Sequence, residues 1–261
     1  MSYQFIVTGR DGPVEHVMLN RPDVRNAFNA EMIAELAAWA AGFVANPNGA
    51  RVVVIGGAGK AFCAGADAAW LATLASHSEA DNLRDATVTS QMFRALDELP
   101  VPLIGRVHGA AIGGGAGLAA VCDIVVSADD AVFGFTEVKL GIIPAVISPF
   151  VVSKIGPSAA RELFVTGARF PAARAYKIEL VHAVVPLGDV DATIERYVTE
   201  IVAGGPDAIA AAKTLVRDVS QAGGKDVTAM TAQALAARRA SPEGQEGLRA
   251  FLEKRKPRWQ P

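Results

Sequence analysis

Residues 103–117 read Leu-Ile-Gly-Arg-Val-His-Gly-Ala-Ala-Ile-Gly-Gly-Gly-Ala-Gly, and this stretch indicates the fold. Its apolar start, Leu103–Val107, predicts a buried strand, because Pro100-Val-Pro102 ends the preceding segment and restarts the chain. The glycine-dense turn that follows leads into a short helix predicted over Gly115–Val121. Glycine lets backbone approach a ligand closely, and a helix that begins at such a turn points unpaired N–H groups outward. The stretch therefore predicts a strand, a turn and a helix that can present backbone donors.

A similar turn occurs earlier, where Gly56-Gly-Ala-Gly-Lys-Ala-Phe-Cys-Ala-Gly-Ala-Asp67 follows a predicted buried strand, Arg51–Ile55. Either turn alone is explained by tight packing of a strand on a helix, whereas the two together can form an anion-binding site. Neither is a nucleotide motif. Gly56–Lys60 is too short for a P-loop, and Gly113–Gly117 does not give GxGxxG. The 4 histidines form no HExxH pattern and GxSxG is absent, so no metal site and no nucleophile elbow is indicated.

The rest of the chain alternates predicted strands and helices, which predicts an α/β fold with parallel strand pairing. Further strands are predicted at 4–9, 14–20 and 123–127, and helices at 30–44, capped by Asn29, and at 78–99. From about Gly188 the chain is largely helical, in segments 189–203, 206–221, 226–240 and 242–255. We therefore expect a core of residues 1–187 and a C-terminal helical region of residues 188–261.

The composition is that of an ordinary globular protein, with 51% hydrophobic and 20% charged residues over 261 positions. A net charge of −2 argues against a nucleic-acid partner, which needs a basic face. The N-terminus has no signal-peptide pattern, and no apolar run reaches the roughly 18 residues of a membrane helix. Cys63 and Cys122 form no CxxC and are predicted to be small buried side chains. Together these features predict a cytoplasmic protein without a membrane partner.

Several motifs occur in a fixed order along the chain, at 20–28, 61–67, 108–119, 122–124, 133–144 and 241–255. This ordered set resembles the crotonase, or enoyl-CoA hydratase/isomerase, superfamily from end to end. The resemblance implies a spiral of repeated ββα turns with a C-terminal helical trimerisation region, and assembly as homotrimers or dimers of trimers. Ala145–Phe150 and Trp70 look most like bacterial methylglutaconyl-CoA hydratases of leucine catabolism.

The resemblance also implies a site for an acyl-CoA, with coenzyme A as part of the substrate and no other cofactor. The oxyanion hole of the family falls on the backbone N–H groups of Ala66 and Gly114. Its second catalytic glutamate falls on Glu137, but its first falls on Gly117. Contacts to coenzyme A are implied for the first turn and for a neighbouring C-terminal helix, at Arg25, Ala64, Ala66, Asp67, Phe251 and Lys254.

The glycine at the first glutamate position leaves the reaction open between alternatives. Glu137, with an ordered water or another acid, can still hydrate a 2-enoyl-CoA, and this is the favoured reading. A lone carboxylate is also what the Δ3-Δ2 isomerases of the family use to move a proton from C2 to C4. A non-catalytic acyl-CoA-binding protein or an RNA-interacting member of the family is the third alternative, and the net charge and the motifs do not support nucleic acid.

Overall fold

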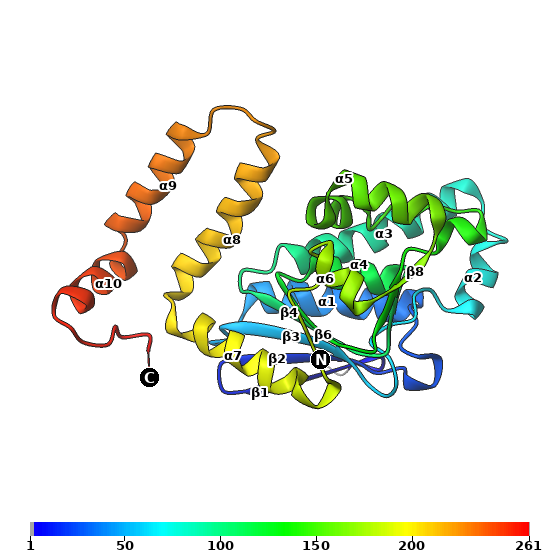
Figure 1. The fold of residues 1–261 in the computed structure, drawn as a ribbon, viewed down its shortest axis with the longest axis horizontal. Coiled ribbons are helices and arrows are strands. Elements are labelled where there is room, and N and C mark those ends of the chain that lie inside the picture. Colours follow the sequence, from blue (N-terminus) through cyan, green and yellow to red (C-terminus); the bar gives the residue numbers. More distant parts are fainter. Residues whose placement is uncertain (1–2, 261) are drawn as a thin grey trace.

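The main sheet of the computed structural model, which describes residues 3–260, has the strand order β1-β2-β3-β4-β6-β9 (Figure 1). Its strands are β1 (Ile6–Asp11), β2 (Val14–Leu19), β3 (Val52–Gly57), β4 (Leu103–Val107), β6 (Ile124–Ala128) and β9 (Ala183–Val185). β1 and β2 pair antiparallel as a hairpin, and each later pair of neighbours is parallel. The predicted α/β fold with parallel pairing is therefore confirmed.

A smaller sheet turns this arrangement into the expected spiral. Its strands are β5 (Ala110–Ile112), β7 (Val132–Gly134) and β8 (Arg169–Pro171). β4 is followed by β5 and by helix α4 (Gly114–Val121). β6 is followed by β7, by the 3-10 segment η2 (Glu137–Leu140) and by α5 (Ser148–Thr166). β3 joins the same series, since Cys63 after it forms an isolated bridge to Ala111 of β5. The β4 and β6 units each place one strand in each sheet before the helix, as the ββα repeat requires, and the β3 unit has the isolated bridge in place of its second strand.

Both faces of the main sheet are covered, and the alternation of side chains along β3 shows this directly. Val53 and Ile55 pack in the larger core, with helices α1 (Ala30–Ala45) and α3 (Glu79–Asp97). Asn29 Oδ1 accepts a hydrogen bond from the Met32 N–H at 3.0 Å, which confirms the predicted cap of α1. In Figure 1 these helices and α4 lie on one side of the sheet. The larger core, between the main sheet and these helices, thus supports the two glycine turns.

The opposite face of the sheet is covered by the first C-terminal helix, α7 (Val190–Ala203). Its Val190 and Ile194 pack with Val52 and Val54 of β3. The division between residues 187 and 188 stays a prediction. The remaining short elements are η1 (Pro22–Val24), α2 (Ala68–Leu74), α6 (Ala172–Lys177) and η3 (Leu187–Asp189).

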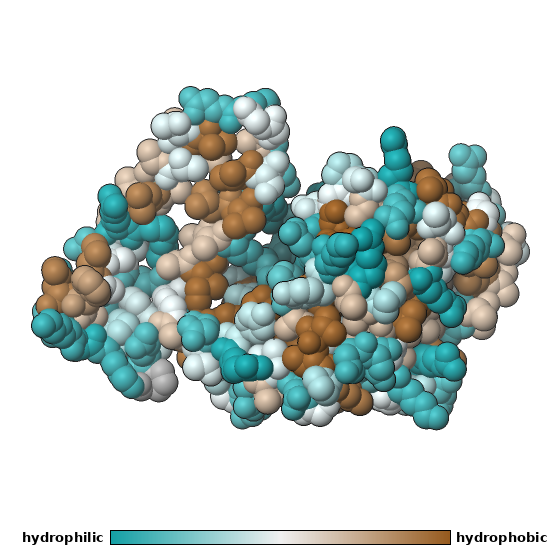
Figure 2. All heavy atoms as spheres, viewed as in Figure 1, coloured by the Kyte–Doolittle hydropathy of each residue, from teal (hydrophilic) through white to brown (hydrophobic). Residues whose placement is uncertain are grey.

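The last helices, α8 (Pro206–Gln221), α9 (Thr228–Ala240) and α10 (Pro242–Leu252), extend away from the core as an arm (Figure 1). Figure 2 shows hydrophobic side chains along α8 and α9 and at the end of α10. The last helix ends sooner than predicted, and Lys254 beyond it takes a left-handed φ of 54°. None of the helices described over residues 3–260 is long and apolar enough to cross a membrane.

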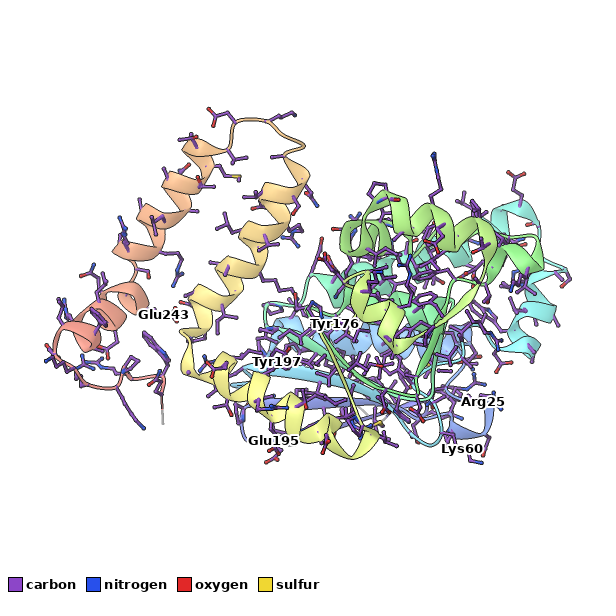
Figure 3. The ribbon with its side chains drawn as sticks, viewed as in Figure 1. Arg25, Lys60, Tyr176, Glu195, Tyr197 and Glu243 are labelled. Carbon is purple, nitrogen blue, oxygen red and sulfur yellow. The ribbon has the colours of Figure 1, made fainter. Side chains whose placement is uncertain are left out.

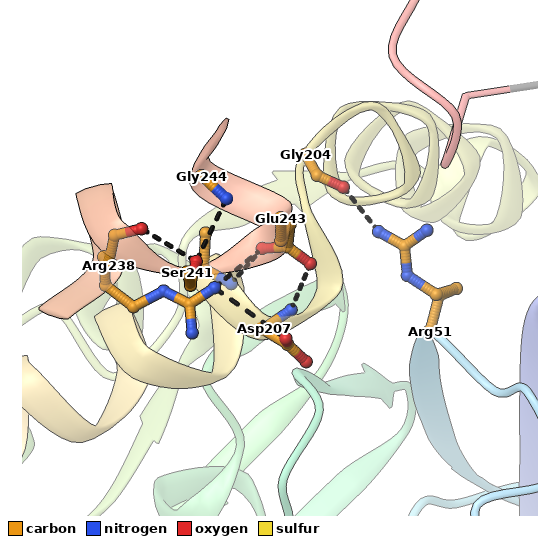
Figure 4. A network of polar contacts seen from close by, with 8 residues as sticks. Arg51, Gly204, Asp207, Arg238, Ser241, Glu243 and Gly244 are labelled. Atoms are coloured by element: carbon orange, nitrogen blue, oxygen red, sulfur yellow. Dashed lines mark hydrogen bonds and ion pairs between the residues drawn. The ribbon is translucent and has the colours of Figure 1, made fainter. Parts of the chain in front are cut away.

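A network of polar contacts connects α10 to the start of α8 within the arm (Figure 4). The Glu243 carboxylate accepts hydrogen bonds from the N–H groups of Asp207 at 3.0 Å and Ala208 at 2.8 Å. Arg238 Nη2 donates to Glu243 Oε1 at 3.1 Å. Ser241 Oγ accepts from the Gly244 N–H at 3.0 Å and so caps α10. Glu243 therefore satisfies free N–H groups at the start of α8 and fixes α10 against it.

A cavity of about 1300 Å³ lies between the arm and the core, lined by side chains of α3, α5 and α8. Lys213 of α8 reaches across it to Asp123, with an Nζ–Oδ2 distance of 2.8 Å. None of Ala66, Gly114 and Glu137 lines this cavity. These three residues of the predicted site therefore lie elsewhere, at the two glycine turns and at the start of η2.

Candidate active site

The two glycine turns meet backbone to backbone. The Cys63 N–H donates to the Ala110 carbonyl at 2.9 Å, and the Ile112 N–H donates to the Cys63 carbonyl at 3.0 Å. A Cβ added to Gly65 would lie 2.9 Å from the Ile112 carbonyl oxygen and 4.0 Å from Gly113 Cα. Gly65 and Gly113 have φ values of 95° and 54°, which favour glycine. The close approach that the sequence predicts for these turns is therefore present, and it leaves no room for side chains between them.

A backbone N–H group without a protein partner stands beside each of these glycines. Gly114 is the first residue of α4, so its N–H lies at the free end of the helix. The Phe28 N–H donates to the Gly65 carbonyl, and the Asp67 N–H donates to the Phe28 carbonyl. Within residues 3–260, neither the Ala66 N–H nor the Gly114 N–H donates to a protein acceptor. The contact between the turns is thus flanked by two available donors.

Glu137 places a carboxylate against the same contact. A Cβ on Gly113 would lie 3.1 Å from Glu137 Oε1. The other oxygen, Oε2, is buried and has no hydrogen-bond partner among the described residues. Burial raises the pKa of the Glu137 carboxyl above that of an exposed glutamate. A half-buried carboxylate with an unpaired oxygen and a raised pKa has the properties of a general acid–base group.

Gly117, one turn further along α4, faces a filled space. A Cβ on Gly117 would lie 2.9 Å from Ile147 Cβ, closer still to Ile147 Cγ2, and 3.3 Å from Phe93 Cε1. Ile147 is 1% exposed and immediately precedes α5. The position of the expected first glutamate is therefore occupied by apolar side chains from neighbouring elements.

Known proteins that are similar to this chain show which family it belongs to. The family model described as enoyl-CoA hydratase/isomerase matches residues 9–261. The chain belongs to the enoyl-CoA hydratase/isomerase family. A Thermus thermophilus protein provisionally named an enoyl-CoA hydratase is 36% identical over 248 residues, which covers 95% of this chain and 98% of that protein.

Solved structures of this family superpose over nearly the whole chain. An enoyl-CoA hydratase from Shewanella pealeana is 36% identical with a TM-score of 0.94, and the match covers 98% of this chain and 96% of that one. A Legionella pneumophila protein, provisionally titled an enoyl-CoA hydratase/isomerase (crotonase), is 38% identical with a TM-score of 0.91 and coverages of 99% and 100%. The expected crotonase fold is thereby confirmed.

Within the crotonase fold, the predicted residues of the first turn lie together. The Ala64 N–H donates to the Arg25 carbonyl at 2.9 Å, which joins the Arg25 turn to this one. Asp67 is 8% exposed, and its carboxylate accepts from the Ala69 N–H and from Arg21, both at 2.7 Å. The hydrogen bond from Arg21 lowers the pKa of the Asp67 carboxyl. Asp67 thus fixes the turn that carries Ala66, and its carboxylate is already engaged within the protein.

Phe251 and Lys254 do not join this crotonase site within one chain. Figure 3 shows Arg25 and Lys60 at one end of the molecule and Glu243 of α10 at the other. Phe251 is 81% exposed at the end of that helix. Within one chain, these two predicted coenzyme A contacts therefore lie far from the glycine turns.

Sequence reasoning gave no role to Lys60 and Ile147. Lys60 is exposed and lies with Arg25 at one corner of the molecule (Figure 3). A Cβ on Gly59 would lie 2.8 Å from Pro22 Cβ, so the Lys60 turn packs against the Arg25 turn. Lys60 occurs only in the incomplete P-loop pattern Gly56–Lys60, which predicts no ligand contact. Ile147 lies in the stretch 145–150, which resembles one subgroup of the family and contains no catalytic motif.

Proposed function

We propose that the protein hydrates a 2-enoyl-CoA, with the thioester oxygen held by the Ala66 and Gly114 N–H groups and with Glu137 as the acid–base group. The observation that carries this proposal is the pair of unpaired N–H groups beside a half-buried carboxylate with a raised pKa. Membership of the enoyl-CoA hydratase/isomerase family supports it. By analogy with other oxyanion holes, each N–H group contributes about 2.7–4 kcal/mol to the transition state.

The proposed reaction needs only one carboxylate. Glu137 takes a proton from water as the water oxygen bonds to C3 of the enoyl chain. The electrons of the double bond move toward the thioester, and the charge that develops on its oxygen is stabilised by the two N–H groups. Glu137 then returns the proton to C2, which gives a 3-hydroxyacyl-CoA and restores the carboxylate.

Binding of coenzyme A is assigned to two groups of residues. Arg25, at the end of η1, and Lys60, on the first glycine turn, are exposed cations that suit the phosphates of the ligand. Phe251 and Lys254 would complete the site from the arm of another copy, in a homotrimer or a dimer of trimers. Residues 145–150 and Trp70 favour 3-methylglutaconyl-CoA, an intermediate of leucine breakdown, as the substrate, and a cytoplasmic location remains part of the proposal.

Isomerisation of a Δ3-enoyl-CoA is the second candidate, and the packing at Gly117 favours it. Because Ile147 and Phe93 fill the space beside Gly117, no second group is available there to hold water. A proton shuttle from C2 to C4 needs no such group, since Glu137 can remove and return the proton itself.

The test is incubation with 3-methylglutaconyl-CoA, crotonyl-CoA and 3-hexenoyl-CoA, followed by mass spectrometry and chromatography. Hydration adds the mass of water, and isomerisation shifts the double bond at constant mass. Glu137→Gln should lower turnover by at least about 10²-fold. Glu195→Gln, on the exposed side of α7, is the matched control and should not change it. Binding without turnover of any of the three esters would instead establish an acyl-CoA-binding protein.

A further inference from the structure

Gly117 and Gly114 lie on the same face of α4, because residues three apart in a helix are neighbours. A side chain at residue 117 would therefore project beside the Gly114 N–H group, where the reacting atoms of the substrate are placed by the proposed function. The volume for that side chain is taken by Ile147, whose Cβ would lie 2.9 Å from a Cβ at Gly117. Ile147 thus fills the space that a side chain at residue 117 would take.

Ile147 is held firmly in this place. It is 1% exposed, and its carbonyl accepts a hydrogen bond from the Val151 N–H at 3.1 Å in the first turn of α5. Phe93 lies beside it, and its ring packs against Phe28 and Phe150 with centroid distances of 6.2 Å in each case. Ile147 and Phe93 belong to the same buried core, which leaves little free space for either side chain to move.

The wall formed by Ile147 and Phe93 is apolar. The three atoms nearest to a Cβ at Gly117 are all carbons of these two side chains. An ordered water needs two to four polar partners, roughly, and a cavity large enough to hold it. Neither side chain offers a water a hydrogen bond, and the space directly beside Gly117 is filled.

We propose that Ile147 is the residue that restricts this site to chemistry with a single carboxylate. The inference rests on the proposed function and deepens it. With Ile147 in place, Glu137 must both remove and return every proton, which suits a shuttle between C2 and C4 or a water held only on the Glu137 side. Removal of Ile147 together with a carboxylate at residue 117 should convert the site to water addition by two carboxylates.

The first experiment compares the wild type with Gly117→Glu, Ile147→Ala and the double variant. Hydration of crotonyl-CoA and isomerisation of 3-hexenoyl-CoA are measured for each. We expect Gly117→Glu alone to lower the unfolding temperature and to give no gain in hydration, since its side chain has no room. The double variant should hydrate crotonyl-CoA at least about 10-fold faster than Ile147→Ala, toward the 10²–10⁴-fold typical of a general acid–base group.

A second, smaller pair of variants tests the packing itself. Gly117→Ala should lower the unfolding temperature of the wild type, and should lower it much less when it is introduced into Ile147→Ala. Ile155→Ala, a truncation further along α5 at a residue with 8% exposure, is the matched control background, in which Gly117→Ala should cost as much as in the wild type. An equal reduction of that cost in the Ile155→Ala background would contradict a specific contact between residues 117 and 147.

The inference is overturned if Gly117→Glu alone hydrates as fast as the double variant. It is also overturned if the folded double variant binds crotonyl-CoA and hydrates it no faster than Ile147→Ala. Lack of turnover by the wild type with every ester contradicts the proposed function instead. In that case, a gain of hydration in the double variant still supports the role of Ile147, and no gain overturns it.

Discussion

Arg21 and Asp67 form an ion pair behind the turn that carries Ala66, with an Nη2–Oδ2 distance of 2.7 Å. The second oxygen of the same carboxylate caps α2 by accepting from the Ala69 N–H at 2.7 Å. One side chain thus ties the η1 turn, the first glycine turn and the start of α2 together. We expect this connection to fix the direction of the Ala66 N–H.

Asp67→Ala should therefore destabilise the protein and impair turnover, whereas Asp67→Asn should keep the helix cap and lose only the ion pair. We expect loss of the cap to lower the free energy of unfolding by about 1 kcal/mol, and the unpaired Arg21 to lower it further. Because the native pKa of Asp67 is lowered, its stabilisation is present above the unfolded-state pKa and is lost as the pH falls through the native value. Urea denaturation at neutral and acidic pH measures this; an equal effect of both variants on stability would contradict separate roles for the cap and the pair.

The raised pKa of Glu137 predicts a particular pH dependence of activity. The base form is lost as the pH falls through the raised value, so kcat/KM should decline at a higher pH than an ordinary glutamate would give. A pH profile of kcat/KM from about pH 4.5 to 9 measures this. A profile that follows an unperturbed glutamate, near a pKa of about 4.3, would contradict the role assigned to burial.

The same shift has an opposite consequence for stability. A raised carboxyl pKa stabilises the fold below the unfolded-state pKa, and this contribution is lost as the pH rises through the native value. Relative to the wild type, Glu137→Gln should therefore gain in unfolding temperature as the pH rises from acidic to neutral. Thermal unfolding of both proteins across this range gives the difference, and a difference that falls with pH would contradict the prediction.

Much of the fold was predictable because the local signals agree with the tertiary structure. The strand Leu103–Val107 has the bounds predicted for it, and Asn29 caps α1 as expected. The smaller sheet was not predictable from pattern, because its three-residue strands such as Ala110–Ile112 are too short to show periodicity. The spiral came only from the family resemblance.

Of the candidate site, too, only a part was predictable from the sequence. Ala66, Gly114 and Glu137 lie in local motifs and were named through the family resemblance, and their catalytic roles remain proposals. Ile147 was missed because its effect depends on a contact with Gly117, 30 positions earlier, which no local pattern of side chains records.

The arm offers a separate test at Glu243, which satisfies N–H groups at the start of α8 and accepts from Arg238. Glu243→Ala should lower the free energy of local unfolding of the arm by about 1 kcal/mol or more, because the caps are lost. Hydrogen exchange should become faster in α8 and α10 and stay unchanged in β3 and β4. Glu253→Ala, which removes only an exposed partner of Arg255, is the control. Faster exchange throughout the core would show that the arm is not an independent unit.

Cys63 and Cys122 should resist thiol reagents in the folded protein. Both are buried, and burial raises the pKa of each thiol to about 12, so almost no thiolate forms near neutral pH. A colorimetric thiol reagent at pH 8 should detect neither cysteine in the native protein and both in denaturant. Rapid labelling of the native protein would contradict the packing described for them.

The contact between the glycine turns limits how the protein can be redesigned. Side chains at Gly65, Gly109 and Gly115 would run into the carbonyl oxygens of Ile112, Lys60 and Cys63. The spacing of the two donor groups is consequently set by main chain alone and cannot be adjusted in small steps by substitution. Laboratory evolution of new substrates should collect its changes on the surrounding walls, and libraries that vary these glycines should return almost entirely unfolded proteins.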